Sequence, residues 1–386
     1  MRYAGWGLLF LLVIGLGLWS TWGAVKGILP FIRPAPQLPE GEPLPFSLEE
    51  GFVARLYTND VPGARVLLRD PRGVLLASLT DNGSVVALPD ADANGVADTV
   101  VQIISGLRKP HGLAFRCAPD CAFYIAEEHA VREYAYDPET RQATYVRTLA
   151  ALPFGRGHTT RSLLAHPNGK DLLVAIGSSC NVCNERDPRR AAILAIDLES
   201  GAVRPFATGL RNTVFMAARR GEVWGTDMGR DFLGDDLPPD EINILRERAW
   251  YGWPWFYGQN VEDFAFNPNA RPSFAQESVP SHIDIPAHSA PLGLAFIPAE
   301  GWPAEFQGDL LVAYHGSWNR SVPTGYKVVR MKLTPDGQHT STTDFITGFL
   351  KEGEAIGRPA GILAEPGGIV YVSDDHAGAI YRITRE

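Results

Sequence analysis

The sequence predicts an all-β protein with the architecture of a six-bladed β-propeller, and three observations lead to that prediction. A unit of apolar strand, tight turn and apolar strand recurs six times between residues 64 and 383. Helical periodicity is nearly absent after residue 25. The turns include PRG (71–73), PNG (167–169) and PGG (366–368), which suit tight connections between neighbouring strands.

Each copy of the repeated unit corresponds to one blade. Consecutive copies are spaced by roughly 45–80 residues, which is the spacing of propeller blades lengthened by loops. The copies occupy residues 64–88, 111–136, 161–197, 212–245, 292–333 and 360–383. We expect six four-stranded sheets around a channel, with the first strand of each sheet facing it.

A strand-like segment, FVARLY (52–57), precedes the first copy. We expect it to complete the last blade and so close the ring, because an unclosed propeller leaves an exposed sheet edge. Residues 46–386 are long for one ordinary domain, but a propeller accommodates that length as a single unit.

The first 25 residues predict a signal peptide or a membrane anchor. Arg2 is followed by about 20 apolar or small residues without an acid, a length that can span a bilayer. The stretch has no clear small-residue cleavage site, which favours an uncleaved anchor with Arg2 on the cytoplasmic side. Residues 26–45 are proline-rich and predict an extended linker. We therefore expect an exported, periplasmic protein that contacts the membrane only through its N-terminal segment.

The formal net charge is −9. An acidic chain is a poor partner for nucleic acid, so that class of ligand is excluded. The charge needs no further functional reason, because acidic surfaces keep exported proteins soluble.

The four cysteines form two close pairs, Cys117/Cys121 and Cys180/Cys183. An oxidising compartment favours a disulfide within each pair. The second pair, CNVC, is not followed by a histidine and is therefore not a haem attachment site. A metal shared by the two pairs is the alternative, although their separation does not match a zinc finger.

The segment DADANGVAD (90–98) resembles the first half of a calcium-binding loop, with oxygen side chains at alternate positions before a glycine. Its candidate ligands for a structural calcium ion are Asp90, Asp92, Asn94 and Asp98. The closing bidentate glutamate is missing, because the twelfth position is Val101. An acidic turn without metal is the alternative.

Six motifs, each at an equivalent place in a successive unit, resemble the glucose/sorbosone dehydrogenase family. They are GHTTRSLLAHPNGKDLLVAIGSSCNVC (157–183), GLRN (209–212), DMGRDFLGDDLPPDEINIL (227–245), YGWPWFYG (251–258), HGSWNR (315–320) and GRPAG (357–361). Members of this family are soluble-type sugar dehydrogenases that use pyrroloquinoline quinone and calcium. The resemblance covers the chain from about Phe52 to Arg385 and implies oxidation of an aldose or a sugar aldehyde, with an unidentified electron acceptor.

The resemblance also implies roles for individual residues. His158 matches the general base that removes the proton of the sugar's anomeric hydroxyl. Arg211 and Asn212 match the pair that binds the carbonyl edge of the quinone. Gly229 and Arg230 match the loop whose backbone carbonyls bind the cofactor's calcium ion, although better-studied relatives have Gly-Pro there.

Cations are expected around the carboxylates of the quinone, because a guanidinium donates two hydrogen bonds to a carboxylate at once. Arg358 of GRPAG matches one such arginine of the family. Arg320 or Lys327 is the candidate for the family's lysine, since an insertion blurs the match. His111, His288 and His315 also begin or end inner strands; each is expected to be a packed or capping histidine rather than the base.

Two further segments have competing interpretations. RDFLGDDLPPDE (230–241) has five carboxylates, a pattern also seen in glycoside hydrolases, but its two prolines favour a loop that frames the channel mouth. YGWPWFYG (251–258) supplies aromatics that either stack on a sugar ring or pack the blade.

Two classes of function remain open from the sequence. The first is a quinone-dependent sugar dehydrogenase. The second is a propeller that binds a ligand without redox chemistry, or that hydrolyses a lactone with a bare calcium ion. Lactonase propellers hold their metal with carboxylate and asparagine side chains from several blades. This chain has cations at those positions, which suits an anionic cofactor and favours the dehydrogenase.

Overall fold

The computed structural model describes residues 44–117, 121–267, 269 and 271–386. The expected leader (1–25) and all but the end of the expected linker (26–45) lie outside the described residues. Within the described part of the chain, no helix combines the length and the apolar character needed to cross a bilayer.

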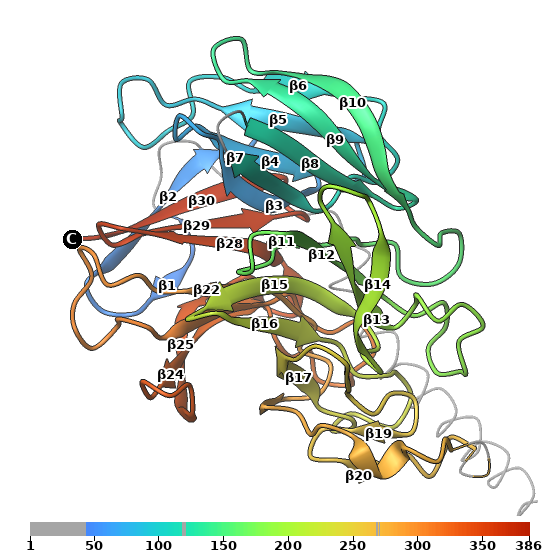
Figure 1. The fold of residues 1–386 in the computed structure, drawn as a ribbon. Helices are drawn as coiled ribbons and strands as arrows, with labels where there is room; N and C mark the ends of the chain where they lie inside the picture. Colours follow the sequence, from blue (N-terminus) through green and yellow to red (C-terminus); the bar gives the residue numbers. More distant parts are fainter. Residues whose placement is uncertain (1–43, 118–120, 268, 270) are drawn as a thin grey trace, which may run out of the picture.

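Six sheets follow one another around the molecule, as the sequence predicts (Figure 1). Sheet 1 contains β3 (Ala64–Arg69), β4 (Leu75–Leu79), β5 (Ser84–Leu88) and β6 (Val101–Ile104). Sheet 2 contains β7 (Leu113–Cys117), β8 (Cys121–Glu127), β9 (Ala130–Asp137) and β10 (Gln142–Ala151). Sheet 3 contains β11 (Leu163–Ala165), β12 (Asp171–Ile176), β13 (Ala192–Asp197), β14 (Val203–Thr208) and β18 (Ala249–Trp250).

Sheets 4 to 6 complete the ring. Sheet 4 contains β15 (Thr213–Arg219), β16 (Glu222–Asp227), β17 (Asp240–Leu245) and β21 (Ile283–Ile285). Sheet 5 contains β22 (Pro291–Phe296), β23 (Leu310–Tyr314), β24 (Lys327–Leu333), β25 (His339–Thr347) and β1 (Ser47–Leu48). Sheet 6 contains β28 (Pro359–Glu365), β29 (Ile369–Asp374), β30 (Ala379–Arg385) and β2 (Phe52–Thr58). Two small hairpins, β19 (Phe256–Tyr257) with β20 (Val261–Glu262) and β26 (Leu350–Lys351) with β27 (Glu354–Ala355), and a 3-10 turn, η2 (Ala275–Glu277), lie in the connections.

The first strand of each sheet lines the central axis, as expected. The inner strands contact their neighbours in a closed circle, in the order β3, β7, β11, β15, β22, β28 and back to β3. A cavity of about 270 Å³ lies among these strands and is lined mainly by apolar side chains, including Leu67, Leu113, Leu163 and Met216. The axis of the propeller is therefore apolar along the inner strands.

The ring closes as the sequence predicts, because β2 pairs antiparallel with β30 (Figure 1). The expectation of four strands per sheet holds for four sheets, and two sheets are larger. In sheet 5, β1 pairs with β25, and in sheet 3, β18 pairs parallel to β14. Both added strands have two residues, which is too short for an alternating pattern to be visible in the sequence.

Apolar side chains fill the space between adjacent sheets. One such cluster contains Phe123, Ile125 and Tyr134 of sheet 2 together with Leu76 and Val85 of sheet 1, all nearly inaccessible to solvent. The central strands, such as β4, β5, β12 and β23, are buried along their whole length, which explains why they read as continuous apolar runs rather than alternating ones. The outer strands β10 and β25 are largely exposed.

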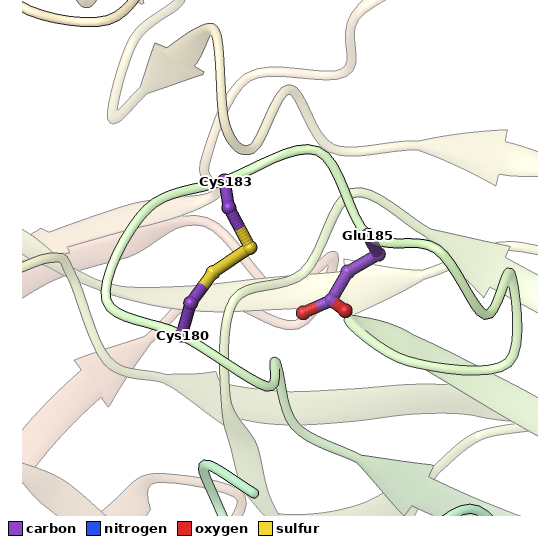
Figure 2. Close-up of side chains that lie close together, drawn as sticks. All are labelled: Cys180, Cys183 and Glu185. Atoms are coloured by element: carbon purple, nitrogen blue, oxygen red, sulfur yellow. A yellow bond between two sulfur atoms is a disulfide. The ribbon is translucent and has the colours of Figure 1, made fainter.

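Both expected disulfides are present. Cys117 at the end of β7 is bonded to Cys121 at the start of β8, and Cys180 is bonded to Cys183 in the loop after β12. In chain-entropy terms a loop of this length contributes only about 2 kcal/mol to stability. Cys180, Cys183 and Glu185 form the one cluster of potential metal ligands among the described residues (Figure 2), but their sulfurs are already joined to each other.

Candidate active site

A cavity of about 120 Å³ opens where the loops of sheets 3, 4 and 5 meet. Loops at this end of each sheet precede the first strand or follow the second strand. The cavity is lined by His158, Arg211, Met228, Gly229, Asp231, Asp240, His288, Ala290, Trp318 and Asn319. The structure therefore brings together His158, Arg211 and Gly229, three of the residues singled out in the sequence.

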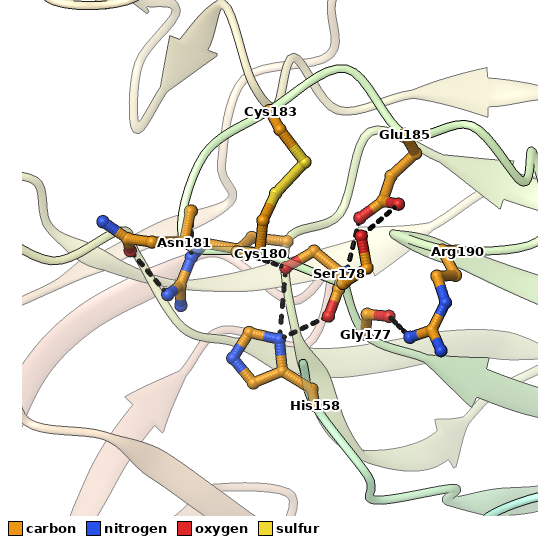
Figure 3. The surroundings of a disulfide bond; sticks show 10 residues. His158, Gly177, Ser178, Cys180, Asn181, Cys183, Glu185 and Arg190 are labelled. Carbon is orange, nitrogen blue, oxygen red and sulfur yellow. Dashed lines mark hydrogen bonds between the residues drawn. A yellow bond between two sulfur atoms is a disulfide. The ribbon is translucent and has the colours of Figure 1, made fainter. Parts of the chain in front are cut away.

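His158 lies in the loop before β11 and its ring is held by one residue, Ser178. The ring Nδ1 is 3.1 Å from both the carbonyl oxygen and the hydroxyl oxygen of Ser178 (Figure 3). The Ser178 hydroxyl donates its own proton to the Cys180 carbonyl at 2.6 Å, so both oxygens face Nδ1 as acceptors. Nδ1 must then carry the ring proton, which leaves the lone pair on Nε2.

The electrostatic environment keeps the His158 imidazole neutral. Burial, followed by the positive charge of Arg211, lowers the pKa of His158 to about 3. At neutral pH the ring is therefore unprotonated at Nε2 and can accept a proton from a neighbouring hydroxyl group.

Two glycines allow His158 to take this position. At Gly157, with φ +75°, a Cβ atom would lie 2.2 Å from the Ser178 carbonyl oxygen. At Gly177 a Cβ atom would lie 2.4 Å from Asn212 Oδ1 and 2.6 Å from His158 Cβ. The base and the Asn212 amide thus approach each other only because residue 177 has no side chain.

Arg211 and Asn212 precede β15 and are fixed by a buried aspartate of the next strand. Asp227, the last residue of β16, accepts hydrogen bonds from the Asn212 N–H at 2.9 Å and the Thr213 hydroxyl at 2.7 Å. Sheet 6 repeats this arrangement: Asp374, the last residue of β29, accepts the N–H of Arg358 at 2.9 Å. Arg358 is therefore the counterpart of Asn212 two sheets further on.

The buried Asp374 gives the protein a measurable pH dependence. Burial raises its pKa from the ordinary 3.8 to about 6, so the folded state holds this proton more tightly than the unfolded chain does. The contribution to stability is fully present below the unfolded pKa and is lost as the pH rises through 6. Between pH 4 and pH 7 we expect the free energy of unfolding of the wild type to fall by about 2 kcal/mol relative to Asp374→Asn. Urea titrations at each pH measure this difference, and a constant difference would refute the assignment.

The loop after β16 carries Gly229 and Arg230. The Gly229 N–H donates to Asp240 Oδ1 at 2.8 Å, which orients the peptide, and a Cβ atom at this position would lie 2.8 Å from the Pro239 carbonyl oxygen. The side chain of Arg230 pairs with Asp263 at 3.0 Å. The arginine thus ties the loop to the connection between β20 and β21.

Asp231 links three loops at the cavity. Its carboxylate accepts hydrogen bonds from Asn319 Nδ2 at 2.7 Å and from Arg211 Nη2 at 3.2 Å. Beside it, Phe232 is 72% exposed, and its ring meets Trp318 edge to face with centroids 6.0 Å apart. Phe232 also has φ +71°, a region that costs a bulky residue on the order of 1–3 kcal/mol. Phe232 and Trp318 therefore form an exposed aromatic pair at the mouth of the cavity.

The other expected cations lie outside the cavity lining. Arg320 pairs with the exposed Asp236 at 2.6 Å, and Lys327 pairs with Asp344 at 2.6 Å. Arg358 is 3% exposed, and its guanidinium donates to the backbone carbonyls of His315 and Gly316. In this structure the three side chains are engaged with protein groups.

The competing histidines are placed as the sequence analysis expects. His111 is fully buried and packs edge to face against Phe215. His315 donates from Nε2 to the Asp375 carboxylate at 2.8 Å and is also buried. His288 does line the cavity, but its Nε2 donates to the Gly234 carbonyl at 2.7 Å. Each of the three rings has a packing or hydrogen-bonding role.

The aspartate side chains of the 90–98 loop accept hydrogen bonds from backbone N–H groups of the same loop. Asp90 accepts the Gly95 N–H, Asp92 accepts the Asn94 N–H and Asp98 accepts the Ala91 N–H. These carboxylates do not gather within 4.8 Å of one another as a group in the described chain. The guanidinium of Arg382, from β30, packs against Gly95 and supplies positive charge to the loop.

The acidic and aromatic segments are placed by tertiary contacts. Asp235 accepts hydrogen bonds from Ser321 and Asp236 pairs with Arg320, so the acidic loop is joined to the loop after β23. Tyr251 and Trp253 are buried and line a second cavity, of about 20 Å³, whose lining shares Arg211, Met228 and Gly229 with the first. These two aromatics therefore pack behind the site, and the aromatics at its mouth are Phe232 and Trp318.

Several residues of the site were missed by the sequence analysis. They are Asn181, Asp231, Phe232, Asp240, Trp318 and Asn319. All six lie inside the motifs quoted above. Asp240 is the first residue of β17, and the other five lie in loops at the same end of the propeller. The position of those five in loops that follow second strands was the available signal.

Comparison with known proteins places this site in a family. The family model described as TrAA12-like matches residues 46–248 and 261–386. The chain belongs to the TrAA12-like family. The resemblance read from the sequence is confirmed at this level, because the relatives of the TrAA12-like chain include quinone-dependent sugar dehydrogenases.

Three relatives illustrate the comparison. An uncharacterized protein of Borreliella burgdorferi is 35% identical over 237 residues, which are 59% of this chain and 61% of that protein. The pyrroloquinoline quinone-dependent pyranose dehydrogenase of Coprinopsis cinerea is 25% identical and aligns with 89% of this chain and 56% of its own length. A Trichoderma reesei carbohydrate-active enzyme of family AA12, solved with iodide, superposes with a TM-score of 0.77 at 21% identity, covering 91% of this chain and 100% of that one.

The TrAA12-like chain thus spans less than two thirds of the length of these two curated relatives. The structural match, at 21% identity, establishes the shared propeller fold.

Proposed function

We propose that this protein oxidises an aldose or a sugar aldehyde with pyrroloquinoline quinone, and that His158 is the general base. One observation supports this most directly: a neutral imidazole with a free Nε2 lines the same cavity as Arg211. The dependence of the Coprinopsis cinerea relative on this quinone points to the same chemistry.

The residues around the cavity fit the carbonyl edge of a quinone. Asn212 Oδ1 is buried and has no hydrogen-bond partner in the described chain, while its Nδ2 lies 3.5 Å from the weak acceptor Met228 Sδ. Rotating the Asn212 amide by 180° loses only the contact with Met228 Sδ. It puts the NH₂ group, with its two N–H donors, where Oδ1 now lies. Asn212 and Arg211 can then donate together to the carbonyl oxygens of the quinone.

The same region can hold the remaining parts of the cofactor. The backbone carbonyls of Gly229 and Arg230 would bind calcium, a cation that prefers oxygen ligands. The resemblance assigns the carboxylates of the cofactor to Arg358 and to Arg320 or Lys327. These side chains lie outside the cavity lining, and Arg320 and Lys327 can exchange their exposed ion pairs at small cost. When bound, the calcium-polarised quinone would accept the hydride of the anomeric carbon.

His158 would perform the proton transfer. Its Nε2 accepts the proton of the sugar's anomeric hydroxyl, while the Nδ1–H bond to Ser178 keeps the ring in place. The nearby charge of Arg211 disfavours the imidazolium form, so the ring would release the proton again after each turnover.

One experiment tests the proposal directly. Purified apoprotein is titrated with pyrroloquinoline quinone in the presence of calcium and, in parallel, of a chelator, while bound quinone is followed by absorbance. Dye-linked oxidation is then measured over a panel of aldoses and sugar aldehydes. If the wild type binds no quinone, the proposal falls and the non-redox propeller becomes the better description.

Arg211→Ala should weaken quinone binding before it affects chemistry. The change removes a charge-assisted donor from the cavity, which is worth about 1.5–3 kcal/mol, so the dissociation constant should rise roughly 10- to 100-fold. Turnover at saturating quinone should change much less. Arg189→Ala, which removes an exposed guanidinium paired with Asp187, is the control, and equal effects of the two changes would count against the role of Arg211.

Phe232→Ala should weaken the binding of sugar. The exposed ring stands with Trp318 at the mouth of the cavity, where aromatic faces suit the C–H faces of a pyranose. We expect KM for sugar to rise about 10-fold, an effect of about 1.4 kcal/mol, with kcat and quinone affinity nearly unchanged. Phe264→Ala, which removes another exposed ring (79%), is the control and should leave KM for sugar unaltered. If Phe232→Ala changes only the KM for the electron acceptor, the surface binds the acceptor and not the sugar.

Export to the periplasm is part of the proposal. Two disulfides and the absence of free cysteines in the described chain favour an oxidising compartment. Release of the protein by osmotic shock, compared with its recovery in the membrane fraction, would distinguish a cleaved leader from an anchor.

A further inference from the structure

The disulfide between Cys180 and Cys183 closes a four-residue ring in the loop after β12 (Figures 2 and 3). The two residues inside the ring are Asn181 and Val182. Because the loop is covalently closed, the backbone of Asn181 has far less freedom than it would in an open loop of the same sequence. The ring lies beside the cavity that contains His158 and Arg211.

Asn181 makes four hydrogen bonds to sheet 4. Its backbone carbonyl accepts from Arg211 Nε at 2.9 Å, and its Oδ1 accepts from Arg211 Nη2 at 2.8 Å. The same Oδ1 accepts the Asp231 N–H at 2.8 Å, and Nδ2 donates to the Asp231 carbonyl at 3.1 Å. A single residue of sheet 3 thus holds both the arginine and the loop that follows Gly229.

The ring also supports the base on its other side. The Cys180 carbonyl accepts the proton of the Ser178 hydroxyl at 2.6 Å, and the Ser178 hydroxyl oxygen faces His158 Nδ1 (Figure 3). Glu185 strengthens the start of the loop by accepting hydrogen bonds from the N–H and the hydroxyl of Ser179. The disulfide-closed ring, residues 180–183, therefore supports both His158 and Arg211 through hydrogen bonds.

We propose that Asn181, held in the disulfide-closed ring, is a positioning residue that sets Arg211 and the 229–231 loop for the cofactor. The proposal rests on the proposed function for the identity of that cofactor. Asn181 acts through Arg211 and the loop, and it needs no contact with quinone or sugar. A neutral amide suits this role because it both accepts from the guanidinium and donates to a carbonyl.

The test uses two pairs of matched variants of the full chain. Asn181→Ala is compared with Val182→Ala, which changes the other residue of the same ring without removing a hydrogen-bonding group. The double variant Cys180→Ser/Cys183→Ser is compared with Cys117→Ser/Cys121→Ser, which opens the other short disulfide loop, in sheet 2. Both double variants lose a ring of similar size, so a general loss of stability affects them alike.

Three measurements are made on each variant. Hydrogen exchange of the Asp231 amide in the apoprotein reports the hydrogen bond to Asn181 without any cofactor. Absorbance titration with pyrroloquinoline quinone and calcium gives the dissociation constant, and dye-linked turnover is measured at saturating quinone. In Asn181→Ala and in the Cys180/Cys183 variant we expect about 10-fold faster exchange and about 10-fold weaker quinone binding, with turnover changed less than about threefold.

The outcomes separate this proposal from the proposed function. Unchanged exchange and unchanged affinity in Asn181→Ala would overturn it, and so would equal effects in Val182→Ala or in the Cys117/Cys121 variant. If the wild type binds no quinone but exchange at Asp231 still accelerates, the role of Asn181 in holding the loop stands and the proposed function fails.

Discussion

His158→Gln should slow sugar oxidation by about 10²–10⁴-fold, the usual cost of removing a positioned base, while quinone affinity changes less than about threefold. The roles are divided in the structure. Arg211, Gly229 and Asp231 line the cavity and would face the cofactor, whereas His158 presents an Nε2 lone pair that no protein donor occupies in the described hydrogen-bond network. Glutamine has a similar size but cannot accept a proton at neutral pH.

The measurement is single-turnover oxidation of sugar by enzyme saturated with quinone, followed by the absorbance of the cofactor. His282→Gln is a suitable control, because its ring nitrogen bonds the Gly337 carbonyl and packs against Trp224 away from the cavity. Full oxidation by His158→Gln at saturating quinone would show that the base lies elsewhere. Since His111 is fully buried against Phe215, His288 would then be the residue to test.

The low pKa of His158 makes a further distinction possible. A base whose pKa lies near 3 stays deprotonated throughout the ordinary range of assay pH. If the activity of the enzyme reconstituted with quinone falls near pH 6.5, one of two explanations applies. Either another group titrates, or the bound cofactor offsets the charge of Arg211 and so raises the pKa of His158.

The blade architecture could be predicted because it is repeated. Six units of similar pattern each specify a sheet, and the turns between strands carry glycine where the chain must reverse. By contrast, β1 and β18 pair two residues each, and segments this short have no period to detect. Their pairing depends on where the neighbouring sheets place their edges.

The site was predictable to the extent that it lies in local motifs. His158, Arg211 and Gly229 meet in one cavity, as the order of the motifs implies. The partners of Arg358 could not be predicted, because they depend on contacts between loops of sheets 5 and 6. Lys327 pairs instead with Asp344 of the neighbouring strand β25. The same holds for the 90–98 loop, where Arg382 arrives from the last strand of the chain.

The aspartates at the ends of β16 and β29 show how the repeat builds the site. Asp227 and Asp374 occupy equivalent positions and each accepts the N–H of the residue before an inner strand, Asn212 or Arg358. The aspartate thus fixes the backbone of the residue before the inner strand, and the side chain of that residue can differ between sheets. One position carries the buried Asn212 amide, which packs against Gly177 beside His158, and the other carries a guanidinium buried between sheets 5 and 6.

Gly177→Ala should reduce turnover about 100-fold or more and also weaken quinone binding, although the change adds only one methyl group. The new Cβ would lie 2.4 Å from Asn212 Oδ1 and 2.6 Å from His158 Cβ, both far inside contact distance. Neither neighbour can yield freely, because His158 is held by Ser178 and the backbone of Asn212 is held by Asp227. A displacement of about 1 Å at a reacting group typically costs about 10²-fold in rate.

The control for this change is Gly221→Ala. Gly221 lies in the turn between β15 and β16, where a Cβ atom would meet nothing within 4 Å, and its φ of +86° makes the substitution unfavourable for the backbone alone. If both variants fold, Gly221→Ala should lose stability but keep kcat and quinone affinity, whereas Gly177→Ala should lose both. Equal kinetic constants in Gly177→Ala and wild type would mean that His158 and Asn212 need not approach each other for the reaction. The close packing of the base against the amide would then have no part in the chemistry.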